Sequence, residues 1–200
     1  ESSFQHIVTH SWDWYEENGV KLQAGERVCR IDVATGMVET ESGIQEPYDI
    51  LILATGSLPF IPPIPGVRKE GVIAFRDVND CETMARYAKT YRKATVIGGG
   101  LLGLEAAQGL LNLGMETDVV HNAQYLMNRQ LDRTAAVLLQ RRLEQQGMRF
   151  HLAKDTVNII GRNRAQGLMF ADGNRLETDL VVLAVGIRPN IAQRNRHRIS

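Results

Sequence analysis

The chain has 200 residues, of which 44% are hydrophobic and 23% charged, enough for the buried core of one or two globular domains. Its 23 basic and 23 acidic side chains balance, which gives no reason to expect nucleic acid or an anionic membrane as a partner. The two cysteines, Cys29 and Cys81, form no paired motif, which argues against a zinc site or a redox dithiol. The sequence contains neither a long apolar run nor a signal-peptide pattern, so a cytoplasmic location is expected.

The first sixty residues predict a helix, a small antiparallel sheet and one deeply buried strand. Residues 11–19 are typical of a short helix, because Ser11 can accept a hydrogen bond from a free amide and Gly19 can adopt the left-handed closing conformation. Residues 50–54 are continuously apolar, which predicts a strand buried on both faces of a parallel sheet. Between them, alternating β-favouring segments predict a meander, over residues 20–24, 27–33 and 37–42.

A proline-rich stretch at 57–66 predicts an ordered, extended connector and the boundary between two domains. Behind it, apolar strands alternate with helices, and this order predicts a parallel α/β sheet with right-handed crossovers. The expected strands are 94–98, 117–121, 148–152 and 179–186. The expected helices are 77–91, 101–113 and 132–146, the last burying Ala135, Leu138, Leu139 and Leu143 on one face. A second antiparallel meander is expected over 156–161, 165–170 and 174–178, with a turn at 171–174.

Gly98, Gly100 and Gly103 form a G-x-G-x-x-G motif between a predicted strand and a predicted helix. The first glycine allows a tight turn, the second lets a pyrophosphate approach the backbone, and the third lets helix and strand pack closely. The helix N-terminus then offers free amides to the phosphates. The alternative is a glycine-rich turn without a ligand. The predicted dinucleotide site comprises Gly98, Gly99, Gly100, Leu101, Leu102 and Gly103.

The residue that usually contacts the adenosine ribose is an acid at the end of the next strand, about 20 positions further on. Here that position is His121. A neutral imidazole could bind the 2′-hydroxyl, whereas a protonated one, helped by Arg129, could bind a 2′-phosphate. A half-exposed histidine without such a role is an equal alternative, so the choice between NADH and NADPH stays open.

Three segments in this order resemble the FAD-dependent pyridine nucleotide-disulfide oxidoreductase superfamily. They are I-L-I-L-A-T-G-S-L-P-F at 50–60, V-I-G-G-G-L-L-G-L-E-A-A at 96–107 and D-L-V-V-L-A-V-G-I-R-P-N at 179–190. The resemblance implies a Rossmann-like NAD(P)H domain inserted into an FAD domain. It also implies a chain that is a segment of a longer protein. Residues 1–63 would be a middle slice of the FAD domain, 64–188 the NAD(P)H domain, and 189–200 a return linker with a frayed, solvated end.

The resemblance also implies roles for residues outside the glycine motif. Glu105, expected in the first turn of its helix, would lie near the nicotinamide, or would simply complement the helix dipole. Gly186 would lie near the nicotinamide ribose. Ala54, Thr55 and Gly56 would approach the flavin, or would form a plain strand exit. No residue is a convincing nucleophile or general base, which is consistent with hydride transfer between cofactors.

Within the superfamily, D-W-Y-E-E-N-G-V at 13–20, the stretch 98–115 and L-M-N-R-Q-L-D at 126–132 are most similar to large subunits of NAD(P)H-dependent nitrite reductases. The resemblance implies that NAD(P)H passes a hydride to FAD, with sirohaem and iron–sulfur centres outside this chain, because two isolated cysteines cannot ligate such clusters. A ferredoxin, rubredoxin or disulfide reductase of the same superfamily and a non-catalytic nucleotide-binding module are the alternatives. The expected partners are a nicotinamide dinucleotide and the remaining domains, not nucleic acid or membrane, and a homodimer is left open.

Overall fold

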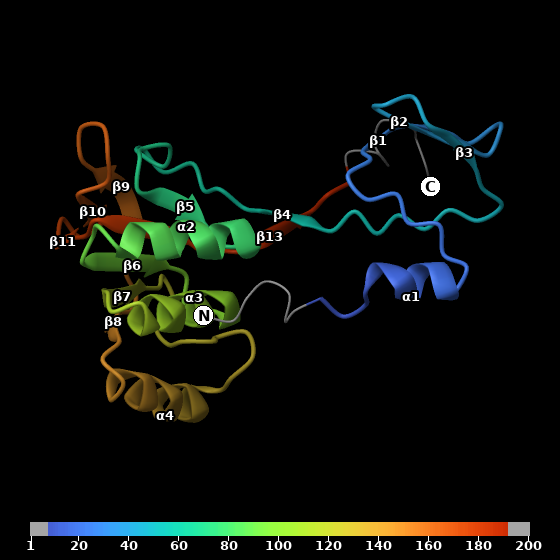
Figure 1. Cartoon of the computed structure of the whole chain (residues 1–200). Coiled ribbons are helices and arrows are strands. Elements are labelled where there is room, and N and C mark those ends of the chain that lie inside the picture. Colours follow the sequence, from blue (N-terminus) through green and yellow to red (C-terminus); the bar gives the residue numbers. More distant parts are fainter. Residues whose placement is uncertain (1–7, 192–200) are drawn as a thin grey trace. The chain divides into compact units, whose positions relative to one another are not determined.

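The computed structural model describes residues 8–191, and the chain divides into two compact units (Figure 1). The first unit extends to Thr55 and resumes at Ile191, and the second is Gly56–Asn190. The proline-rich connector therefore groups with the second unit, because β4 (Ser57–Pro59) pairs antiparallel with β13 (Ile187–Pro189). The division falls at 55/56, ahead of the expected boundary at 63/64.

The first unit contains one helix and a three-stranded antiparallel meander. Helix α1 (Trp12–Glu17) begins as expected, because the Ser11 side chain accepts a hydrogen bond from the Trp14 amide at 3.4 Å. Gly19 follows the helix with a φ of +66°. The meander consists of β1 (Val28–Asp32), β2 (Met37–Thr40) and β3 (Gln45–Pro47). The expected strand at 20–24 is absent from the described structure, and the third strand comes from 45–47 instead.

The prediction of a buried strand at 50–54 was wrong. These residues form no strand, and the side chains of Ile50 and Ile52 are 85% and 82% exposed. A strand of this kind needs a hydrogen-bonded neighbour and a packed layer on each face. The described residues supply neither to this segment, so its apolar side chains remain on the surface.

The second unit is built on a five-stranded sheet whose paired strands are all parallel, in the order β5-β12-β6-β7-β8. The strands are β5 (Val72–Ala74), β12 (Leu180–Leu183), β6 (Lys93–Ile97), β7 (Glu116–Val120) and β8 (Arg149–His151). Every residue of β12 is buried, as are four of the five residues of β6 and of β7. This burial on both faces explains the continuous apolar runs of the sequence.

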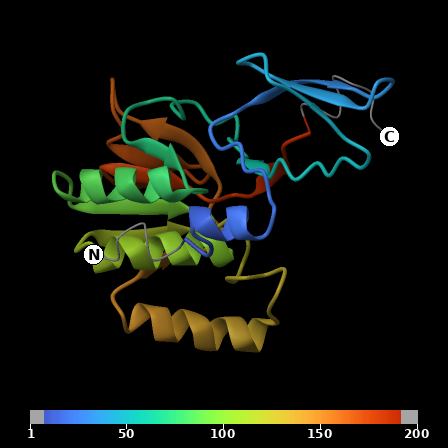
Figure 2. The same ribbon diagram turned by 45° about the vertical axis from the view of Figure 1, so that its right-hand side comes forward.

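Three helices cover one face of this sheet, and a second antiparallel meander covers the other (Figure 2). The helices are α2 (Val78–Ala88), α3 (Leu101–Asn112) and α4 (Arg133–Glu144). The meander is β9 (Thr156–Ile160), β10 (Gly167–Phe170) and β11 (Arg175–Glu177). Successive residues of β12 belong to different cores: Val182 to the core that includes Leu110 of α3, and Val181 to the core that includes Leu168 of β10. The α/β fold class is therefore as predicted.

Helix α4 confirms the predicted amphipathic pattern except at one position. Its N-cap is Asp132, whose side chain accepts a hydrogen bond from the Ala135 amide at 2.8 Å. Leu139 and Leu143 pack against the helix-side core, but Leu138 is 62% exposed. The buried face is turned towards the fully packed Ala136, and this rotation carries Leu138 out to solvent.

Candidate functional site

Two of the three motif glycines between β6 and α3 have a packing role. Gly98 has a φ of +128°, and a Cβ there would lie 2.3 Å from the carbonyl oxygen of Ala184. A Cβ at Gly103 would lie 1.9 Å from the carbonyl oxygen of Gly98. The Gly98 amide also donates to the Val120 carbonyl at 2.8 Å. Glycine at 98 and 103 therefore allows β6, α3 and the end of β12 to approach one another.

Gly100 differs from these two because none of residues 8–191 fills the space beside it. Its φ is −88°, which any residue can adopt, and a Cβ there would meet no atom within 4 Å. Gly100 is the N-cap of α3 and no side chain caps this helix, whereas Asp77 caps α2 and Asp132 caps α4. The first amides of a helix lack intrahelical partners. Free donors and a partial positive charge therefore face an open space, which suits phosphate groups.

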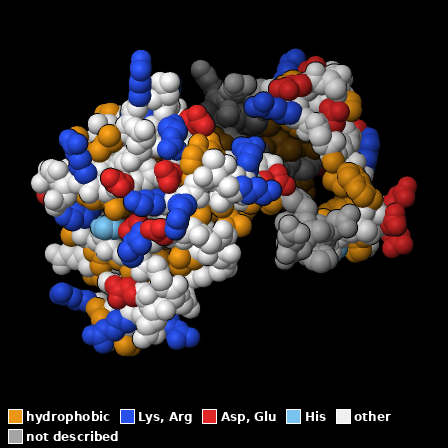
Figure 3. Space-filling view, turned by 60° about the vertical axis from the view of Figure 1, so that its left-hand side comes forward, with side chains coloured by type: hydrophobic (Ala, Val, Ile, Leu, Met, Phe, Trp, Pro, Cys, Tyr) orange, Lys and Arg blue, Asp and Glu red, His pale blue; other side chains and the backbone are white. Residues whose placement is uncertain are grey.

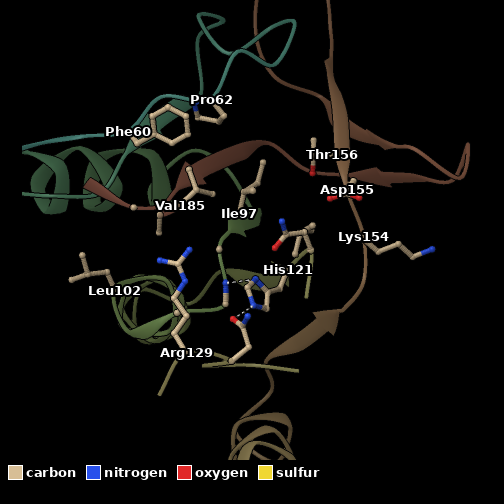
Figure 4. Close-up of a pocket in the computed structure, with 18 of the residues that line it drawn as sticks. Phe60, Pro62, Ile97, Leu102, His121, Arg129, Lys154, Asp155, Thr156 and Val185 are labelled. Carbon is tan, nitrogen blue, oxygen red and sulfur yellow. Dashed lines mark hydrogen bonds between the residues drawn. The ribbon is translucent and has the colours of Figure 1, made fainter. Parts of the chain in front are cut away.

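This open space belongs to a cleft of about 570 Å³ within the second unit (Figure 4). The cleft lies where β6, β7 and β12 end, the edge at which open parallel sheets bind ligands. Its volume is in the range of cofactor pockets. The walls are formed by residues 97–102, 120–122, 128–130, 154–156 and 184–186, together with Phe60, Pro62 and Ile64.

His121 follows β7 and packs under the glycine turn, which explains why position 99 is also glycine. A Cβ at Gly99 would lie 2.7 Å from Cγ of the His121 ring. The Gly99 amide donates to His121 Nδ1 at 3.2 Å, and His121 Nε2 lies 3.1 Å from Oδ1 of Asn128. An amide can only donate, so Nδ1 accepts this hydrogen bond, and Nε2 lies within hydrogen-bond distance of the Asn128 side-chain oxygen. Both nitrogens of the ring therefore have partners within the chain.

The segment after β7 is fastened to the glycine turn and brings Arg129 to the cleft. The Met127 amide donates to the Gly99 carbonyl at 2.9 Å, and Met127 has a φ of 52°. Figure 4 shows the Arg129 side chain rising past the start of α3, with its guanidinium between Leu102 and Val185. Arg129 is exposed, and no residue of the described chain forms a hydrogen bond or ion pair with it. Its charge is therefore available to an anion in the cleft.

Most of the predicted site residues line this one cleft. Leu101 and Leu102 are exposed on the first turn of α3, and Gly186, with a φ of +125°, lines the cleft after β12. Gly103 is buried behind the turn. Glu105 is exposed but does not line the cleft, and it is the fifth residue of α3, so its expected place in the first turn was wrong. The helix begins at Leu101, directly after the motif's second glycine.

Ala54, Thr55 and Gly56 are not among the residues that line this cleft. All three are exposed and precede β4, and Gly56 has a φ of +69°. The Asn190 amide donates to the Gly56 carbonyl at 3.0 Å. The structure therefore brings together the expected dinucleotide residues apart from Glu105, with Gly103 packed behind the turn, whereas the expected flavin residues are exposed and are not part of the cleft lining.

Several polar groups of the cleft were not predicted, namely Asn122, Asn128, Gln130, Lys154, Asp155 and Thr156. The first three belong to the segment after β7, and the other three follow β8. The carboxyl ends of neighbouring parallel strands meet at the same sheet edge, so the position of these residues after β7 and β8 was a signal in the sequence that they would line the cleft. Lys154 forms an ion pair with Asp172, and its ammonium lies 5.9 Å from the centre of the Phe170 ring.

A buried carboxylate, Asp118, lies outside the cleft on β7. Arg149 donates to both of its oxygens, at 3.1 and 2.7 Å, and Nε2 of His151 lies 2.8 Å from Oδ1. Burial alone would raise the pKa of Asp118, but the hydrogen bonds from His151 and Arg149 outweigh it and hold this pKa below its ordinary value. The hydrogen bonds of Asp118 with Arg149 and His151 connect β7 to β8, beside the loop that carries Lys154 and Asp155.

Within residues 8–191, no group of histidine, cysteine, aspartate or glutamate side chains is arranged to hold a metal ion. None of the helices in this range has the length and apolar character to cross a membrane. On the face shown in Figure 3, Lys and Arg side chains are interspersed with Asp and Glu. The basic end at 193–200 lies outside the described residues.

Comparison with known proteins gives a consistent picture. The family model described as pyridine nucleotide-disulphide oxidoreductase matches residues 3–199. A Bacillus subtilis nitrite reductase [NAD(P)H] is 56% identical over 95% of this chain and 24% of its own length. An assimilatory nitrate reductase electron transfer subunit from the same organism is 49% identical over 96% of the chain and 25% of its own length. This chain thus spans about a quarter of these relatives.

Among solved structures, a ferredoxin reductase from Rhodopseudomonas palustris superposes with a TM-score of 0.90 at 26% identity. The match covers 98% of this chain and 48% of that one. Fold, cleft and sequence agree, and the chain belongs to the pyridine nucleotide-disulphide oxidoreductase family.

Proposed function

We propose that this chain is the NAD(P)H-binding part of a flavin-dependent nitrite reductase large subunit. The cofactors of the family are FAD and NAD(P)H. The observation that carries the proposal is the open space beside Gly100. It lies at the uncapped start of α3, inside a cleft at the carboxyl edge of a parallel sheet. The nitrite reductase assignment rests on the 56% identity to the Bacillus subtilis relative.

We propose one direction for the dinucleotide in this cleft. Its diphosphate would lie against the amides of residues 100–102, with the guanidinium of Arg129 beside it. Its adenosine end would lie towards His121 and the loop after β8. Its nicotinamide end would lie towards Gly186, and Glu105 would approach that end in the whole protein. When bound, NAD(P)H supplies a hydride to the flavin, and the residues of this chain bind and orient the dinucleotide.

For the whole protein, we propose that residues 1–63 contribute to an FAD domain around the NAD(P)H domain at 64–188, with 189–200 leading back. Ala54, Thr55 and Gly56 are exposed, so by themselves they enclose no flavin, and other segments would have to complete that site. Sirohaem and iron–sulfur centres would lie beyond this chain and would receive the electrons. A cytoplasmic location stays a prediction.

One observation favours a second candidate, a reductase that passes electrons to a small redox protein. It is the TM-score of 0.90 to the ferredoxin reductase. Both candidates use the same dinucleotide cleft and differ in the electron acceptor.

The test of the proposal is the dinucleotide affinity of two glycine variants. Gly100→Val should abolish binding of NADH, NADPH and ADP-ribose in titration calorimetry, because its side chain would occupy the diphosphate space. Its far-UV circular dichroism should be unchanged, since the backbone at Gly100 suits any residue. The control is Gly109→Ala on the same helix, whose Cβ would meet only the methyl of Met84 at 3.9 Å. Unchanged affinity in Gly100→Val would refute the assigned phosphate site. If the unmodified chain binds the dinucleotide, an assay of hydride transfer from NAD(P)H to added FAD distinguishes an enzyme from a non-catalytic binding module.

A further inference from the structure

We propose that Met127 is a positioning residue, whose left-handed backbone holds Arg129 beside the diphosphate. The inference rests on the proposed function and concerns how the chain itself prepares the cleft for phosphate groups. Three observations carry it: the conformation of Met127, the contacts that fix this residue, and the place of Arg129 in the turn that begins there.

The backbone of Met127 has a conformation that few side chains tolerate. Its φ is +52°, and Ala153, with a φ of +51°, is the other non-glycine residue of the described chain with a positive value. A Cβ atom makes this left-handed region unfavourable for residues other than glycine, asparagine and aspartate. Met127 directly precedes Asn128 and Ala153 directly precedes Lys154, both of which line the cleft. Unfavourable backbone conformations of this kind concentrate at functional sites.

Contacts of its amide, its carbonyl and its side chain hold Met127 in this conformation. The amide donates to the Gly99 carbonyl at 2.9 Å. The carbonyl accepts two hydrogen bonds, from the amides of Gln130 at 2.8 Å and Leu131 at 2.9 Å. The side chain packs against the helix-side core, which also contains the fully buried Leu126. Contacts with the glycine turn and with the core therefore offset the conformational cost at Met127.

Arg129 lies in the middle of the turn that these hydrogen bonds close. The bond from Leu131 to Met127 runs from one end of this turn to the other, so the backbone sets the direction in which the Arg129 side chain leaves it. That direction leads past the start of α3 (Figure 4). No described residue forms a hydrogen bond or ion pair with Arg129, so the turn, and not a side-chain partner, positions it. A fixed turn also reduces the conformational freedom that Arg129 loses when it contacts a phosphate.

Two variants of equal side-chain carbon count test the role of the backbone. Isoleucine is branched at Cβ and disfavours the left-handed region strongly, whereas leucine is not branched there. Met127→Ile should weaken binding of NADH and ADP-ribose by on the order of tenfold, as loss of the Arg129 contact would. Its affinity should also depend less on salt concentration, because the guanidinium would no longer face the phosphates. Met127→Leu is the matched control and should keep both the affinity and its salt dependence.

A double-mutant cycle with Arg129→Ala distinguishes positioning from a general structural effect. If Met127 acts through Arg129, Met127→Ile should cause no further loss of affinity once Arg129 has been replaced. Titration calorimetry at low and high salt measures the affinities, and thermal melting verifies that each variant is folded. If Met127→Ile is unfolded, Met127→Val introduces the same branch with a smaller side chain, and Met127→Ala is then its control.

The outcomes separate this proposal from the proposed function. An unmodified chain that binds neither NADH nor ADP-ribose would overturn the proposed function itself. Equal affinities in Met127→Ile and Met127→Leu, with binding intact, would overturn the role of Met127 alone. A loss of affinity in Met127→Ile that is just as large in the Arg129→Ala background would overturn it too, because it would not pass through Arg129.

Discussion

Replacing Gly103 with alanine tests whether the third motif glycine is required for packing. The new Cβ would lie 1.9 Å from the Gly98 carbonyl oxygen and 2.9 Å from its carbonyl carbon, both of which are backbone atoms. The turn would have to move by on the order of 1 Å, and overpacking of this kind costs about 1–3 kcal/mol. Alanine recovers about 0.5–1 kcal/mol in a helix. The free energy of unfolding should therefore fall by about 1–2 kcal/mol, or the melting temperature by a few degrees.

The control for this variant lies six residues further along α3. At Gly109 a Cβ would make one ordinary contact, at 3.9 Å from the Met84 methyl, so Gly109→Ala should stabilise the chain by about 0.5–1 kcal/mol. Urea unfolding followed by circular dichroism measures both variants against the unmodified chain. Equal changes in stability at positions 103 and 109 would show that Gly103 does not hold α3 against the turn, and would refute the packing argument.

Two further predictions concern charged side chains. Arg129→Ala should weaken NAD(P)H binding by on the order of tenfold at low salt and less at high salt. The control is Arg133→Ala, four residues further on and outside the cleft, which should leave the affinity unchanged. Equal losses of affinity in calorimetric titrations would contradict the proposed contact of Arg129 with the diphosphate. Asp118→Asn should lower the free energy of unfolding by about 1–3 kcal/mol at neutral pH. Because the folded state lowers the pKa of Asp118, this stabilisation is present above the ordinary value of 3.8 and is lost as the pH falls below it. Urea unfolding at neutral pH and below pH 3.8 compares the free energy of unfolding of this variant with that of the unmodified chain. The difference should shrink in acid, and a constant difference would argue against an ionised Asp118.

The parts of the fold that follow from short-range rules were predictable. The unit β6–turn–α3 is encoded by an apolar run, three spaced glycines and a helix-forming segment, and each signal is local. The same holds for Asp132 at the start of α4, where one side chain caps one amide. At 50–54, by contrast, the apolar run gives the tendency to form a buried strand but not the neighbours that would bury it. Ile50 is consequently exposed in the described structure.

The cleft was predictable in outline but not in its side walls, because these come from strand ends that are far apart in sequence. The sequence alone can place His121 after β7, and it can place Lys154 just beyond β8. It cannot show that the His121 ring fits against Gly99, since that contact depends on how the segment after β7 folds back through Met127 and Asn128.

The contact between Gly99 and His121 links the glycine turn to the segment after β7 within the proposed dinucleotide site. A side chain at position 99 would collide with the ring, and a ring without the Gly99 amide would lose the donor that fixes its tautomer. The shape of the glycine turn and the orientation of the His121 ring are therefore set by one pair of residues. It follows that a change at position 121 should be judged first by whether it can accept a hydrogen bond from position 99. Its effect on the choice of dinucleotide has meaning only where that bond survives.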